Sequence, residues 1–160
     1  MRPPRRRDAA EALALALMEG LAQPSEAARW ADAEILRSPV SEPSLVDLSL
    51  GERDDPQTMA NRLREIPGAP DDEAVLRLYL AIAAKRLASG VLPKHRFADW
   101  LWLRGSKDPL LARIVPELES LYGTSEGVLE GYASEAELDA ELHDALAPLA
   151  LPPGLLPPIL

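Results

Sequence analysis

Residues 71–90, DDEAVLRLYLAIAAKRLASG, form a segment whose apolar side chains recur around most of the circumference of a helix. The segment opens with three carboxylates, which favour the positive end of a helix dipole, and Lys85, Arg86 and Gly90 favour a helix end after them. A helix that is apolar on nearly all sides is buried among other helices. The segment therefore predicts a helical bundle in which it occupies the middle.

Start and stop signals for further helices recur on both sides of this segment. Residues suited to accept the free amide hydrogens of a first turn are Asp8, Ser25, Asp55, Asp108 and Ser134. The expected helices cover about residues 9–22, 26–37, 44–48, 56–66, 93–105, 108–123 and 135–149. Pro116 lies inside one of them and predicts a kink or a break there.

No run of four or more residues alternates apolar and polar side chains with β-branched enrichment, so strands are not expected. A chain of 160 residues is of ordinary length for one domain. We therefore expect an all-α, single-domain bundle of six to eight helices. Its predicted parts are a basic disordered tail over residues 1–7, a helical domain over residues 8–150, and an extended, apolar, Pro-rich tail over residues 151–160.

The chain contains no cysteine, which excludes disulfides and thiolate metal sites and fits a cytoplasmic location. The apolar run after the first arginines is interrupted by Glu11 and Glu19, so it predicts a helix of the mature protein rather than a signal peptide. No stretch reaches the length of uncharged apolar sequence that a membrane span needs, and a membrane partner is not expected.

Charge is distributed unevenly along the chain. All 17 Lys and Arg residues and 17 of the 26 acidic residues lie in residues 1–113, and the remaining nine acidic residues follow with no Lys or Arg among them. The whole net charge of −9 is therefore carried by the C-terminal part. Its sign argues against a nucleic-acid partner and favours either a solvated surface or a surface that binds a basic protein.

Both histidines have a carboxylate four residues away, His95 with Asp99 and His143 with Asp139. This spacing places both groups of a pair on one helix face, as a metal site or a general base with its orienting acid requires. Surface ion pairs give the same pattern, and no nucleophile elbow, phosphate loop or set of metal ligands accompanies the pairs. We expect no metal, cofactor or catalytic residues, and the alternative is an enzyme whose carboxylates and His95 meet in a cleft.

Trp100 and Trp102 are two residues apart, so on a helix they point in widely different directions. An exposed Trp102 would be an anchor for a protein partner, whereas partial cover by the bundle would make both structural. The basic stretch RPPRRR at residues 2–7 has too few arginines beside an acidic chain to predict nucleic-acid binding.

Residues 30–50, WADAEILRSPVSEPSLVDLSL, resemble a pattern found in small uncharacterised bacterial helical proteins. The shared elements are Trp-Ala-Asp, a Pro-containing link and Asp-Leu-Ser-Leu. The resemblance implies a helix-turn-helix scaffold and an immunity-like role.

These observations favour a small acidic protein-binding module that occludes a basic partner protein, as an immunity protein or antitoxin does. A single-sign surface on a compact scaffold raises the rate of association with such a partner. A structural subunit that self-associates is a further alternative. The residues predicted to bind the partner are Glu130, Glu135, Glu137, Asp139, Glu141, Asp144 and Trp102.

Overall fold

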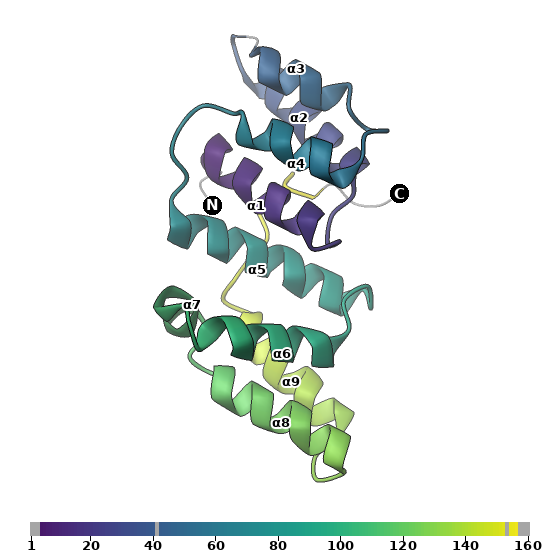
Figure 1. Cartoon of the computed structure of the whole chain (residues 1–160), viewed down its shortest axis with the longest axis vertical. Helices are drawn as coiled ribbons and strands as arrows, with labels where there is room; N and C mark the ends of the chain where they lie inside the picture. Colours follow the sequence, from purple (N-terminus) through teal and green to yellow (C-terminus); the bar gives the residue numbers. More distant parts are fainter. Residues whose placement is uncertain (1–3, 41, 153, 157–160) are drawn as a thin grey trace. The chain divides into compact units, whose positions relative to one another are not determined.

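The computed structural model describes residues 4–40, 42–152 and 154–156, and this part of the chain contains nine helices and no strand. The helices are α1 (Arg6–Met18), α2 (Pro24–Arg37), α3 (Pro43–Ser49), α4 (Pro56–Arg64), α5 (Asp72–Ala88), α6 (Lys94–Gly105), α7 (Pro109–Ile114), α8 (Leu118–Glu130) and α9 (Glu135–Leu146) (Figure 1). The all-α prediction is confirmed. The number of helices exceeds the predicted six to eight, because the break predicted at Pro116 separates α7 from α8.

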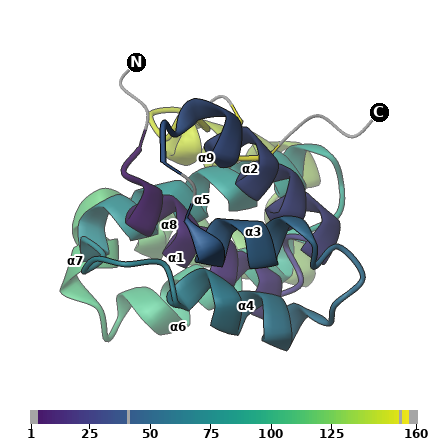
Figure 2. The same ribbon diagram turned by 90° about the horizontal axis from the view of Figure 1, so that it is seen from above.

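The described helices group into two compact units. Unit 1 consists of Met1–Ile82 and Leu151–Leu160, and unit 2 of Ala83–Ala150. In unit 1, α1 packs along α4 and α2 packs along α3, as Figures 1 and 2 also show. In unit 2, α6 packs against α7 and α8, and α8 packs against α9. The chain divides in this way because the helices of each unit pack mainly against one another.

The middle of α5 is buried on nearly every side, as its apolar circumference predicts. Arg77 is exposed, and the buried residues around it are Val75, Leu76, Leu78, Tyr79, Leu80, Ala81, Ile82 and Ala83. The unit boundary falls within this helix, after Ile82.

Ion pairs extend α1 toward the N-terminus, so that it begins at Arg6 rather than near residue 9. Arg5 Nε lies 2.9 Å from Asp8 Oδ2, and Arg6 Nε lies 3.0 Å from Glu34 Oε2 on α2. Arg7 Nη2 pairs with Glu11 Oε2 at 2.9 Å. The disorder predicted for residues 1–7 therefore does not apply to Arg5–Arg7, and residues 1–3 lie outside the described part.

The C-terminal residues from Leu151 on belong to unit 1, where Leu155 and Leu156 are buried. A turn at Gly154, with φ of 84° and a hydrogen bond from Leu155 N to Pro152 O, bends this segment. The extended course predicted for the tail is not confirmed, and Pro153 and residues 157–160 lie outside the described residues.

Three helix pairs are joined by turns of the same construction: α1–α2, α5–α6 and α8–α9. Each turn has a glycine with positive φ, at Gly20, Gly90 and Gly131. In each, the two amides after the glycine both donate to one carbonyl of the preceding helix, that of Ala16, Arg86 or Gly127. This arrangement satisfies the last carbonyls of a helix. Neither unit is a simple copy of the other, but both are built on such helix pairs.

Candidate functional site

Unit 2 contains eleven acidic residues, and the nine that follow residue 113 lie mainly on α8 and α9. The structure describes all nine of these. None is buried. Two of the nine, Glu135 and Asp139, form ion pairs, and the other seven form none within the part of the chain that the structure describes. Unit 2 therefore presents more negative charge than its own cations neutralise.

Lys94, the first residue of α6, contacts two acidic residues near the beginning of α9. Its Nζ lies 2.8 Å from Glu135 Oε2 and 2.8 Å from Asp139 Oδ1. The hydrogen bond to Asp139, together with that to Glu135, raises the pKa of Lys94 above its ordinary value. Hydrogen bonds from Lys94 and then His95 lower the pKa of Glu135. One ammonium thus faces two carboxylates, and the group has a net negative formal charge.

His95 lies between Ser125 of α8 and Glu135 of α9. Its Nδ1 is 2.8 Å from Ser125 Oγ and its Nε2 is 3.1 Å from Glu135 Oε1. This sequence of groups resembles a serine nucleophile with its base and orienting acid, but Ser125 is completely buried in the middle of a helix. A substrate cannot reach its hydroxyl, so the geometry fits a link between three helices. The predicted pairing of His95 with Asp99 does not form.

The predicted acidic residues of α9 point in different directions rather than forming one face. Glu135 and Asp139 face α6 through Lys94. Glu141 faces α8, where it accepts hydrogen bonds from Ser120 Oγ at 3.2 Å and Thr124 Oγ1 at 2.7 Å. Glu137 belongs to the capping box at the start of the helix, in which its Oε2 accepts from Ser134 N at 3.2 Å.

Glu130 and Asp144 complete the predicted set. Both are exposed, and neither takes part in an ion pair with another described residue. They lie at the end of α8 and in the last turn of α9. Within the predicted set, only these two carboxylates have no hydrogen bond or ion pair with another described residue.

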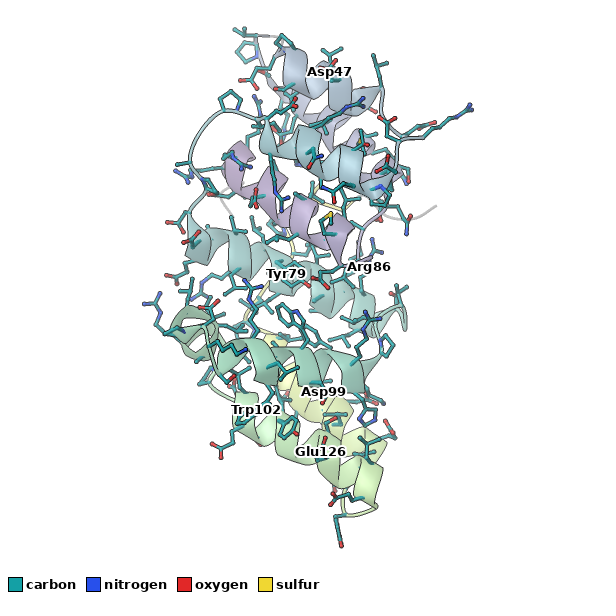
Figure 3. All side chains as sticks on the ribbon, viewed as in Figure 1. Asp47, Tyr79, Arg86, Asp99, Trp102 and Glu126 are labelled. Carbon is teal, nitrogen blue, oxygen red and sulfur yellow. The ribbon has the colours of Figure 1, made fainter. Side chains whose placement is uncertain are left out.

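Trp102 is half-buried and stacks on Tyr122 of α8, with ring centroids 5.0 Å apart and an interplanar angle of 17°. Figure 3 shows it on α6, on the same helix as Asp99. Trp100 is also half-buried, and stacks on Phe97 with centroids 5.9 Å apart. Both tryptophans are thus partly covered, and Trp102 offers a partner only the remaining part of its ring.

A half-open cavity of about 750 Å³ lies between α5, α6 and α9 of unit 2. Its wall is mainly apolar, and its polar side chains are Lys94, Asp139 and His143. The apolar lining residues are Ala84, Leu87, Ala88, Leu92, Pro93, Leu142, Leu146, Ala147 and Leu149. Binding sites for small organic molecules have this size and this mixture of apolar wall and few polar groups. Asp139 and His143 both line the cavity, as their spacing on one face predicts.

Sequence reasoning missed Lys94 and Ser125. One signal pointed to Lys94, because a cation in the first turn of a helix opposes the helix dipole unless it is paired. Ser125 carries no such signal, since its partner is 30 residues away.

Among the described residues, no three His, Asp or Glu side chains are placed to hold a metal ion. None of the described helices is both long and apolar enough to cross a membrane. Comparisons of the chain with protein-family models, curated proteins and solved structures find no match.

Proposed function

We propose that the chain is a protein-binding module whose unit 2 binds and occludes a basic partner protein, in the manner of an immunity protein or antitoxin. The observation that supports this is the excess of carboxylates on α8 and α9: none of the eight is buried, and six form no ion pair within the described part of the chain. Such an excess attracts a cationic surface and favours one orientation of approach.

Glu130 and Asp144 carry the attraction in this proposal, since their charges are not offset locally. Glu135 and Asp139 contribute less, because Lys94 already lies between them. Exposed charges interact across about 10 Å at about 0.1 M salt and about 3 Å at about 1 M. Binding by these residues therefore weakens as salt rises.

The test compares two double charge reversals in the full chain. In E130K/D144K the reversal falls on unit 2, and in D47K/E52K it falls on exposed residues of unit 1, with the same change in net charge. Partners are captured from the source cells at about 0.1 M salt, purified, and titrated against each variant by biolayer interferometry at about 0.1 M and about 1 M.

We expect E130K/D144K to lose at least roughly tenfold in affinity at the lower salt, and D47K/E52K to lose much less. The difference between the variants should shrink at the higher salt. Equal weakening by both variants, or an affinity that salt does not change, would contradict the proposal.

A further inference from the structure

The cavity between α5, α6 and α9 combines an apolar interior with a polar edge of one ammonium, one carboxylate and the imidazole of His143. Nine of its lining residues have apolar side chains, and Lys94 and Asp139 lie together on one side. Lys94 contacts Glu135 and Asp139 at 2.8 Å each, which uses two of the three N–H donors of its ammonium. A ligand carboxylate that accepted the third would lie close to two carboxylates, which repel it.

The charge beside the cavity is therefore net negative. Asp139 contacts Lys94 through Oδ1, which leaves Oδ2 available to accept a hydrogen bond from a ligand. The last residues of α5 and α9 also line the cavity, and the C-terminal ends of helices carry partial negative charge. Each of these groups favours a cation.

Comparison with the α1–α2 turn shows that an open cavity is not a general property of these helix pairs. Ala14 and Leu17 stand in the same positions before Gly20 as Ala84 and Leu87 do before Gly90, and both are buried. Ala84 and Leu87 are only half-buried. The turn in unit 2 therefore leaves apolar surface uncovered that the equivalent turn in unit 1 covers.

We propose that this cavity is a binding site for an aliphatic amine, a hydrocarbon chain that ends in an ammonium group. The chain lies against the apolar wall, chiefly Leu87, Leu142 and Leu146, and the ammonium donates to Asp139. The volume of about 750 Å³ lies within the range of sites that enclose small organic ligands. The amine site does not require a protein partner, although Asp139 belongs both to the cavity and to the residues predicted to bind the basic protein.

The probes are hexylamine, octylamine and decylamine, with decanoate and decanol as the matched carboxylate and neutral ligand. Binding to the full chain is measured by calorimetry, and its location by the methyl resonances of Ala84, Leu142 and Leu146. We expect saturable binding of the amines that tightens roughly tenfold for each two methylene groups added. Decanol should bind more weakly than decylamine, and decanoate most weakly.

Two variants test whether the amine binds in this cavity, and each is paired with a control substitution of the same type outside it. A88F places a ring at an exposed, cavity-lining site and should abolish binding, whereas A140F places it on an exposed site of α9 outside the cavity. D139N should reduce the affinity for decylamine but not for decanol, and D144N should change neither. Thermal melting checks that each variant folds, and A147F replaces A88F if the latter does not.

Three results would overturn the site: no saturable binding of any amine, decanoate binding as tightly as decylamine, or undiminished binding by a folded A88F or A147F. None of them bears on the response of the protein partner to E130K/D144K. Conversely, if no protein partner is found, the amine titrations still test the cavity by themselves.

Discussion

Asp8 is the residue at which local and distant contacts meet in unit 1. It is buried near the start of α1, where Arg5 donates to both of its oxygens at 2.9 and 3.0 Å. The backbone amide of Asp71, just before α5, donates to Asp8 Oδ1 at 2.8 Å. The hydrogen bond from Arg5 is the main cause that lowers the pKa of Asp8. The carboxylate thus joins the first turn of α1 to the segment that leads into α5.

Replacement of Asp8 by Asn should destabilise the protein by about 1 to 3 kcal/mol at neutral pH, because it weakens a buried, charge-assisted contact. A folded-state pKa below the unfolded value, which is about 3.9, gives stability that is complete above that pH. That stability is lost as pH falls through the folded-state pKa. Urea unfolding at several pH values should therefore show the gap between wild type and D8N closing in acid.

The exposed Asp47 supplies the control, because its side chain forms no hydrogen bond or ion pair with another described residue. D47N should leave the free energy of unfolding nearly unchanged. A gap between wild type and D8N that stays constant from neutral to acid pH would show that the charge of Asp8 is not what stabilises the native state.

At the scale of the element, α8 contains two glycines in opposite situations. Gly123 lies inside the helix, and a Cβ added there meets no atom within 4 Å. Gly131 ends the helix with φ of 86°, in the left-handed region where residues with a Cβ are strained. The same substitution should therefore have effects of opposite sign at the two positions.

We expect G123A to raise the free energy of unfolding by about 0.5 to 1 kcal/mol, since alanine favours the helix interior. G131A should lower it by about 1 to 2 kcal/mol, because the left-handed conformation crowds the Cβ. Thermal and urea unfolding of the two variants measures both changes. A gain in stability from G131A would mean that the turn between α8 and α9 relaxes readily into another conformation.

Helix boundaries are largely predictable from sequence because the residues that set them are neighbours. Asp55 and Asp108 cap α4 and α7 by accepting from Thr58 N and Leu110 N, and Ser134 caps α9 by accepting from Glu137 N. The cap expected at Ser25 was wrong, because α2 begins at Pro24 and Gln23 is its N-cap, with Gln23 N donating to Glu26 Oε1. The prediction also failed where distant partners compete. Asp8 was expected to cap the first helix. It lies inside α1 instead, and its carboxylate accepts hydrogen bonds from the Arg5 side chain and from Asp71 N.

The candidate site was less predictable for the same reason. The charge excess of the C-terminal part follows from counting residues, but the distribution of its carboxylates depends on pairings across 17 to 45 positions of the chain. Lys94 meets Glu135 and Asp139 only after α6 and α9 pack in one unit. The cavity likewise requires three helices that no local pattern brings together.

At the scale of the whole molecule, the segment after residue 150 completes the first of the two units. Leu155 is 2% exposed and Leu156 4% exposed, and both belong to unit 1. Truncation of a buried leucine removes apolar contacts and leaves a cavity, which typically costs about 2 to 5 kcal/mol. The loss should fall on unit 1 although these residues follow unit 2 in the chain.

L155A should therefore increase hydrogen exchange in peptides from α1 and α4 and leave peptides from α8 and α9 nearly unchanged. The control is L129A, at a position that is 65% exposed on α8, where exchange should change little. Hydrogen exchange with mass spectrometry resolves the two units. Loss of protection confined to α8 and α9 in L155A would show that the segment stabilises unit 2 instead.

Because residues after 150 belong to unit 1, residues of unit 1 are translated both before and after those of unit 2. Translation proceeds at about 5 to 20 residues per second, and N-terminal parts generally fold first. Here the first 82 residues leave the ribosome without the two leucines that close their core, and the whole of Ala83–Ala150 is made before those leucines appear. Residues 83–150 are thus all translated before Leu155 and Leu156, so unit 2 has its residues before helices α1 to α4 gain these two leucines.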